Sequence, residues 1–233
     1  MPDHDKIFIE HDQAIRAIAR DFEQYPFQLN LLTSLVPMVF GNHAYLMRDT
    51  RSNRLWLKLP ERKKPFVVGE SEIAQRLIRK LKAAPPTEEQ LAKIGTLVFQ
   101  APVKVVAGDA KGARPGLCVD TGMDGFTCLQ CGRCCRLLDY RDGCSLDDFR
   151  RWRNLGRSDI LRWVGTVREA GQVVACRIWM VPGTNRFAEV CPWLKRGDRP
   201  DRFTCTIHDV RPTICREYPG SRKHARMTGC SGV

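Results

Sequence analysis

The chain has 233 residues, 43% of them hydrophobic, which suffices for one large domain or two small ones with an apolar core. It carries a net charge of +12 and 11 cysteines. The polar N-terminus, Met1–Asp5, is not a basic segment followed by an apolar run, and no stretch reaches the length of a membrane span, which argues against a secreted or a membrane protein. We therefore expect a cytoplasmic protein whose cysteines bind metal rather than form disulfides.

Residues 1–106 predict a small α+β unit, and they contain no cysteine. Apolar residues recur at helical spacing in four stretches, which we expect to be helices: 15–22, 29–36, 73–81 and 87–98. Alternating apolar residues predict three strands: 44–47, 55–59 and 103–106. Pro26 and Pro37 are expected to end the first two helices, and Thr87 with Gln90 forms a capping box for the fourth. We interpret this unit as a recognition unit for an unidentified protein partner or substrate.

The positive charge is spread along the chain. There are 18 Lys and Arg against 13 Asp and Glu before Leu117, and 20 against 13 from there onward. Only short basic groups occur, such as Arg62–Lys64. This distribution favours a solvated basic surface slightly over a nucleic-acid site.

Residues 107–116 hold three glycines, one proline and no large apolar residue, so we expect a flexible connector there. The cysteines begin directly after it. We expect residues 117–233 to form a second, irregular domain of short helices and strands that metal stabilises.

The sequence C-L-Q-C-G-R-C-C at Cys128–Cys135 places four cysteines in eight residues. Two-residue gaps allow a tight turn to aim two sulfurs at one metal ion. Gly132 suits a knuckle that needs positive φ and turns backbone N–H groups toward sulfur. The side chains of the adjacent pair Cys134 and Cys135 usually diverge, so the two are expected to serve different metals or different sides of one cluster.

Further elements follow the cysteine run. Ser145 with Asp148 predicts a helix start, residues 158–164 a short helix, and residues 173–181 a strand. Four more cysteines come singly, and Pro212 is expected to begin a helical turn that leads to Cys215. Arg211 and Arg216 beside it can neutralise thiolate charge.

The segment from Phe126 to Pro219 resembles the CxxCxxCC cysteine-cluster family, described as zinc- or iron-chelating, whose domain flagellin lysine N-methylases share. Three motifs carry the resemblance: F-T-C-L-Q-C-G-R-C-C-R from Phe126, C-P-W-L from Cys191, and C-T-I-H-D-V-R-P-T-I-C-R-E-Y-P from Cys205. The chain departs from the family in Cys230-Ser231-Gly232, which stands for Cys-Pro-Gly, and in His208, where many members have Tyr. The resemblance implies eight metal ligands: Cys128, Cys131, Cys134, Cys135, Cys191, Cys205, Cys215 and Cys230. Cys118, Cys144 and Cys176 lie outside the pattern.

Eight thiolates suit two Cys₄ zinc sites, and they equally suit one or two iron–sulfur clusters. The run of two-residue gaps up to Cys134 is how a bacterial ferredoxin motif starts, which favours iron–sulfur by a small margin. Cys135, however, follows without the three-residue gap of that motif.

Three function classes stay open, and the sequence does not decide whether the chain is an enzyme. The first is a metal-binding protein with a structural, redox or cluster-handling role. The second, implied by the resemblance, is a protein-modifying enzyme that binds S-adenosylmethionine through Arg133, Arg136 or Arg216. No glycine-rich loop follows a strand to hold that cofactor. The third is a zinc-dependent nucleic-acid-binding module, supported only by charge and by the likeness to a zinc knuckle.

Overall fold

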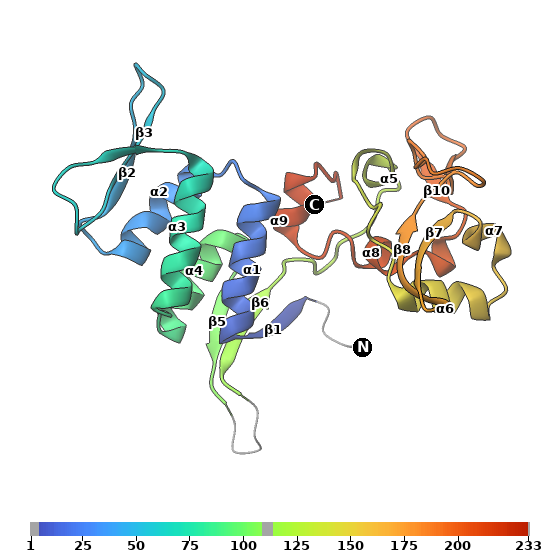
Figure 1. Cartoon of the computed structure of the whole chain (residues 1–233), viewed down its shortest axis with the longest axis horizontal. Coiled ribbons are helices and arrows are strands. Elements are labelled where there is room, and N and C mark those ends of the chain that lie inside the picture. Colours follow the sequence, from blue (N-terminus) through green and yellow to red (C-terminus); the bar gives the residue numbers. More distant parts are fainter. Residues whose placement is uncertain (1–4, 109–113, 233) are drawn as a thin grey trace. The chain divides into compact units, whose positions relative to one another are not determined.

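The computed structural model describes residues 5–108 and 114–232, and the chain forms two compact units, Met1–Asp124 and Gly125–Val233 (Figure 1). Both units mix helices with short strands, which confirms the predicted α+β class. No helix in the described ranges is long and apolar enough to cross a membrane.

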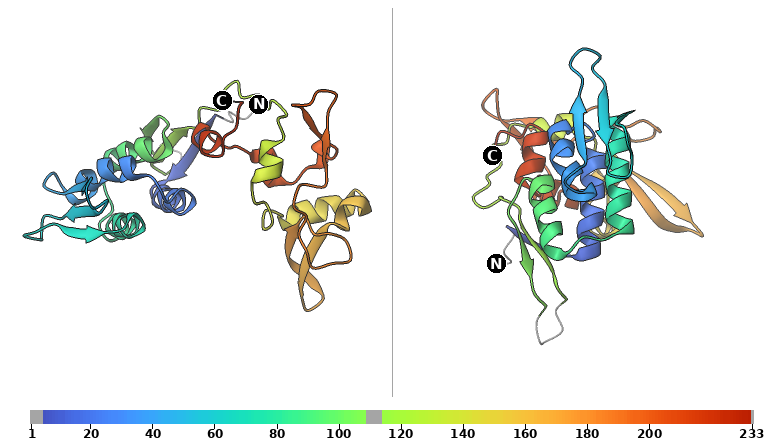
Figure 2. Two further views of the ribbon diagram at one scale, coloured as in Figure 1. Left: turned by 90° about the horizontal axis from the view of Figure 1, so that it is seen from above. Right: turned by 90° about the vertical axis from the view of Figure 1, so that its left-hand side faces the viewer.

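The N-terminal unit packs four helices with two three-stranded antiparallel sheets in its described residues. Its elements are β1 (Lys6–Glu10), α1 (His11–Gln24), α2 (Leu29–Phe40), β2 (Tyr45–Arg48), β3 (Leu55–Lys58), β4 (Phe66–Val68), α3 (Glu70–Ala83), α4 (Glu88–Phe99), β5 (Val103–Val106) and β6 (Gly116–Asp120). One sheet has the order β1-β6-β5 and the other β2-β3-β4. Helices α1, α3 and α4 lie side by side (Figures 1 and 2).

The helices form because each buries one apolar face in a shared core. Ile18 of α1, Leu77 of α3 and Leu91 of α4 are completely buried there. The predicted capping box at Thr87 is present at the start of α4. Helix α2, however, continues through Pro37 to Phe40, so the prediction that this proline ends the helix is wrong. A proline costs the helix one backbone hydrogen bond, and the buried side chains of the same helix offset that cost.

The boundary between the units lies beyond the one expected from composition. Strand β6 pairs with both β1 and β5, and Val106 stands opposite Gly116. The residues between them therefore connect two paired strands of the N-terminal unit instead of linking two domains. Of the expected connector, residues 109–113 lie outside the described residues. Strands β1 and β4 were not predicted.

The C-terminal unit is built from short elements. They are α5 (Arg133–Leu137), α6 (Leu146–Asn154), α7 (Ser158–Leu161), β7 (Val164–Glu169), β8 (Gln172–Ile178), β9 (Leu194–Arg196), β10 (Phe203–Cys205), the 3₁₀ turn η1 (His208–Val210), α8 (Thr213–Glu217) and α9 (Arg222–Met227). The strands make two hairpin-like sheets, β7-β8 and β9-β10.

A small tryptophan-centred core holds this unit together. Trp179 contacts both Trp152 and Trp193, with ring centroids 5.8 Å apart in each pair. The predicted helix start at Ser145 is confirmed as a capping box. Val164 begins β7 and does not extend the preceding helix, because it pairs with Ile178 across the hairpin.

Candidate metal centre

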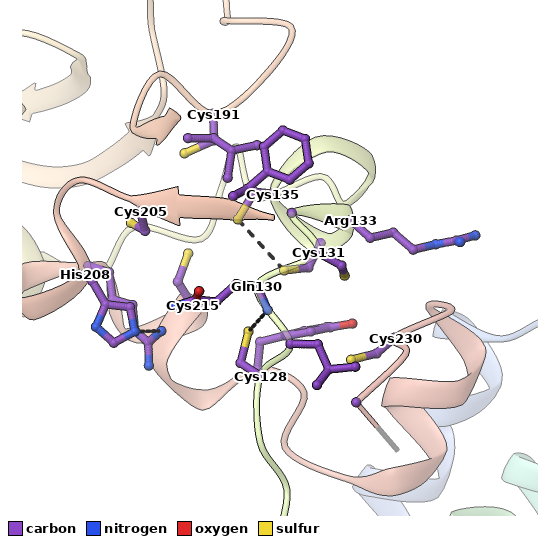
Figure 3. Close-up of a pocket in the computed structure, with 18 of the residues that line it drawn as sticks. Cys128, Gln130, Cys131, Arg133, Cys135, Cys191, Cys205, His208, Cys215 and Cys230 are labelled. Atoms are coloured by element: carbon purple, nitrogen blue, oxygen red, sulfur yellow. Dashed lines mark hydrogen bonds between the residues drawn. The ribbon is translucent and has the colours of Figure 1, made fainter. Parts of the chain in front are cut away.

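All eight cysteines expected from the family resemblance line one cavity of about 480 Å³ in the C-terminal unit (Figure 3). They reach it from the 128–135 segment, from β10, from α8, and from the loops at Cys191 and Cys230. Cys118, Cys144 and Cys176 do not belong to the lining of this cavity. The structure therefore brings together residues that are up to 102 positions apart in the sequence, from Cys128 to Cys230.

The first cysteines sit on a tight knuckle. The backbone N–H of Gln130 donates to Sγ of Cys128 over 3.4 Å, as expected for a turn that presents N–H groups to sulfur. Gly132 has φ of 66°, and a Cβ at this position would come within 2.8 Å of the Phe203 ring. The N–H of Phe203 in turn donates to the carbonyl of Gln130 over 2.7 Å. Glycine is therefore required both by backbone conformation and by close packing.

The adjacent pair Cys134 and Cys135 lies in α5, with the two sulfurs 3.9 Å apart. Two thiolates on one tetrahedral zinc, each at about 2.3 Å, would stand about 3.8 Å apart. The two sulfurs therefore lie close enough to share one ion, while the expectation that they serve different metals or different sides of one cluster stays a prediction. The hydrogen bond between the thiols lowers the pKa of Cys134 to about 7 and raises the pKa of Cys135.

Three of the four cysteines from the later segments, Cys191, Cys205 and Cys215, are partly buried, and burial is the main cause of their pKa shifts. Burial raises the pKa of Cys191 to about 11 and that of Cys215 to about 12, and it also raises the pKa of Cys205. Neighbouring thiolates add to each shift because like charges repel. A cation placed among these sulfurs would relieve that repulsion and favour the thiolates.

Asp148 fixes the helix that carries Cys215. Its carboxylate is 1% exposed and accepts hydrogen bonds from the backbone N–H of Thr213 at 3.0 Å and from the Thr213 hydroxyl at 2.9 Å. The same carboxylate accepts a bond from the Ser145 hydroxyl at 2.9 Å, so it joins the starts of α6 and α8. The sequence pattern predicted only the bond within α6. The indole N–H of Trp152 in α6 donates a further hydrogen bond, to the carbonyl of Val210 just before α8, at 2.7 Å.

Four arginines surround the cysteines in different ways. Arg133, Arg211 and Arg216 line the cavity, and the positive charge of Arg211 helps to lower the pKa of Cys134. Arg211 is bonded to His208 over 2.9 Å, so this histidine faces a guanidinium. The Arg136 guanidinium is outside the lining, stacked on an aromatic ring at 4.8 Å and bonded to the carbonyl of Gly132.

The three arginines named as cofactor ligands are thus differently placed. Arg133 extends away from the labelled sulfurs in Figure 3, with its guanidinium against Gly229. Arg216 donates to the Thr213 hydroxyl and to the carbonyl of Arg211. Arg133 and Arg216 both line the cavity, but the Arg133 guanidinium is packed against Gly229, whereas Arg216 lies next to Cys215 in α8.

Cys144 and Cys176 form a separate pair. They face each other across an isolated β-bridge, and the Cys176 thiol donates to the carbonyl of Cys144 over 3.3 Å. Burial raises the pKa of both thiols, so both are held in the neutral form. Cys118 lies in β6 of the N-terminal unit. Within the described ranges, no three His, Cys, Asp or Glu side chains are arranged in contact distance of a single ion.

A cavity walled by eight cysteines, with arginines at its edge, defines the C-terminal unit as a thiolate-rich metal-binding domain. Residues 127–231 match the family model CxxCxxCC, whose description is "putative zinc- or iron-chelating domain". This match lies within the C-terminal unit and confirms the resemblance drawn from the motifs. Comparison with curated proteins and with solved structures gives no match.

Proposed function

We propose that the C-terminal unit holds an iron–sulfur centre through thiolates of the eight cysteines that share its cavity. The observation that carries the proposal is their convergence on one chamber of about 480 Å³. A single zinc ion uses four ligands, whereas eight thiolates around one space suit a polynuclear centre or two adjacent ones. The role of such a centre is structural, redox or cluster-handling.

The other lining residues suit the same group. Among the described residues, no Asp or Glu lines the cavity, and beside one histidine, His208, its metal-binding side chains are cysteines, the ligands that iron–sulfur clusters use. Arg211 and Arg216 offset part of the thiolate charge. The aromatic side chains of Phe126, Tyr140 and Trp179 wall the space and limit the access of water. Limited solvent access is one of the factors that set the reduction potential of a bound cluster.

Metal analysis of the protein purified without oxygen tests the proposal. We expect iron with acid-labile sulfide and a brown colour with absorption at about 400 nm. If the protein were colourless and held two zinc ions per chain, the iron–sulfur centre would be refuted in favour of two Cys₄ zinc sites. Protein that is folded throughout and holds neither metal would refute a metal centre altogether.

Cysteine replacements distinguish ligands from bystanders. Replacing Cys131 or Cys215 by Ser should release metal and destabilise the C-terminal unit, because the free energy of coordination is part of the free energy of folding. The matched controls are Cys118→Ser and Cys176→Ser, which remove a thiol outside the cavity and should leave the metal content unchanged. Equal metal loss in both groups would show that the ligand set is drawn wrongly.

A second candidate function is a protein-modifying enzyme that binds S-adenosylmethionine. It is favoured by Arg216, which lines the cavity beside Cys215 and could pair with the carboxylate of that cofactor by exchanging its bonds to Thr213 and Arg211. Calorimetric titration of the metal-loaded protein tests it. Micromolar binding that disappears in Arg216→Ala would support the enzyme, and no heat at millimolar cofactor would reject it.

A further inference from the structure

The sheet β2-β3-β4 of the N-terminal unit has two unlike faces. Its inner face carries Leu46 and Leu57, which are 5% and 0% exposed in the core. The strand register sets Met47, Trp56 and Val67 opposite one another in a row across the three strands. Since side chains alternate along a strand, this row lies on the outer face, as the exposed fractions of 49% for Met47 and 47% for Val67 bear out.

Tyr45 extends this outer surface. It is 44% exposed and lies opposite Lys58 in the next pair of the register. The two aromatic rings of the surface therefore stand on neighbouring strands of one sheet, on its open side. Figure 2 shows β2 and β3 as the cyan hairpin at the top of its right-hand view.

The positive charge of the N-terminal unit is concentrated around this sheet. Residues 45–68 hold seven Lys and Arg against two Asp and Glu. The whole unit, Met1–Asp124, holds 18 against 15, so the remainder has 11 basic and 13 acidic residues. The sheet segment is thus the basic part of an otherwise slightly acidic unit.

Several of these cations are available to a ligand. The side chains of Arg51, Lys63 and Lys64 are exposed, and in the part of the chain that the structure describes they make no hydrogen bond or ion pair. Others are occupied by the protein itself. Arg48 donates to the side chain of Asn53 over 2.8 Å, and Arg62 stacks on the Phe66 ring at 4.3 Å. The free cations belong to the loops that flank the strands, at the rim of the outer face.

We propose that the outer face of the β2-β3-β4 sheet binds single-stranded nucleic acid. The exposed ring of Tyr45 and the half-buried ring of Trp56 offer stacking platforms for bases, and the cations of the flanking loops neutralise the phosphates between them. The carboxylates of an acidic peptide would pair with the cations but would not stack on the aromatic rings. A duplex hides its base faces, so it cannot stack on Tyr45 or Trp56. The proposal is independent of the metal centre, which lies in the other unit.

Fluorescence anisotropy with a labelled 15-nucleotide oligouridylate and the full, metal-loaded chain tests this site. We expect saturable binding that weakens as salt rises, with a slope of about 0.7 in log Kd per log salt for each phosphate contact. Tyr45→Ala should raise the Kd by about fivefold or more, because it removes one stacking platform. The double variant Lys63→Gln/Lys64→Gln should weaken binding and reduce the salt slope.

The matched control is Arg16→Gln/Arg20→Gln, which removes two exposed cations from α1 and the same charge from the same unit. It should bind within about twofold of the unaltered chain. Circular dichroism checks that every variant is folded, and Tyr45→Phe, which keeps the ring, should restore binding. Equal weakening by the control and the Lys63/Lys64 variant would reject the site in favour of unspecific charge attraction. Binding of duplex but not of the single strand, or binding only to anionic vesicles, would also overturn it.

Discussion

Replacing Asp148 by Ala should destabilise the C-terminal unit more than any other change to a carboxylate in it. The buried carboxylate accepts bonds from Thr213 and Ser145, and it lies 3.5 Å from the guanidinium of Arg151 and 3.8 Å from that of Arg216. The variant leaves four donor groups without this partner, the N–H and the hydroxyl of both Thr213 and Ser145, together with the two arginines. It also frees the start of α8, and with it Cys215.

The size of the effect follows from these contacts. Hydrogen bonds to a charged group are worth about 1.5–3 kcal/mol each, but donors that lose a carboxylate regain part of this from water. Breaking a buried charged network by removing one partner costs about 3–5 kcal/mol. We expect the free energy of unfolding to fall by an amount in this range, because Asp148 is almost fully buried.

Urea unfolding followed by tryptophan fluorescence measures this loss. Four of the five tryptophans lie in the C-terminal unit, so the signal reports mainly on it. The matched control is Asp147→Ala, which removes the neighbouring carboxylate, 87% exposed and paired with Arg150. An exposed pair contributes less than about 1 kcal/mol. If the two variants lost the same stability, or if Asp148→Ala bound metal as well as the unaltered chain, the link between α6 and Cys215 would be refuted.

Two further predictions concern the knuckle and the thiols. Gly132→Ala should lower both the free energy of unfolding and the metal content by more than the control Gly125→Ala does. Both positions have positive φ, but of the two only Gly132 has a side chain so close that a Cβ would clash with it. Equal losses of stability in the two variants, measured by urea unfolding, would contradict this. In metal-free protein at pH 7.5, iodoacetamide should label Cys134 before Cys191, since their pKa values are about 7 and about 11 and only the thiolate reacts. Peptide mass spectrometry measures the labelling of each cysteine, and the labelling of Cys134 should fall as the pH drops through about 7. Equal labelling of Cys134 and Cys191 at all pH values would contradict the two pKa shifts.

Local patterns in the sequence were sufficient for most helices and for the cysteine cluster. The capping boxes at Thr87 and Ser145 are present as predicted, because both partners of such a bond lie within one turn. The knuckle at Gly132 has the positive φ that its spacing required. Features of this kind depend on residues a few positions apart, which is the range that periodicity and spacing describe.

Features that depend on distant pairing were missed. Strand β1 is short and has little pattern of its own, and it becomes a strand only by pairing with β6 more than a hundred residues later. The segment between β5 and β6 was interpreted as a domain linker because a hairpin connection has the same glycine-rich composition. The bond from Asp148 to Thr213 spans 65 residues and has no signature in either local sequence. Pairing across such distances is decided by the packing of the whole unit.

The two units differ in how much apolar surface supports them, and this difference leads to a prediction about metal removal. Among the described residues, the core cluster of the N-terminal unit contains 22 buried apolar residues, whereas that of the C-terminal unit contains five. Helices α5 and α8, which carry the partly buried Cys134, Cys135 and Cys215, have no fully buried residue. A unit with so small a core gains little from the hydrophobic effect and depends on other cross-links, of which metal coordination is the strongest available here.

Removing the metal with a chelator should therefore loosen the C-terminal unit and leave the N-terminal unit folded. Hydrogen exchange followed by mass spectrometry resolves the two. We expect peptides from 126–232 to lose protection, while those from α1, α3 and α4 exchange as slowly as before, because their protection comes from apolar packing. The Cys176→Ser variant, treated in the same way, controls for effects of a thiol outside the cavity. If protection in 126–232 survived complete metal removal, the tryptophan core and the Asp148 network would be sufficient to hold the unit, and the cysteines would be ligands of a site that the fold forms without metal.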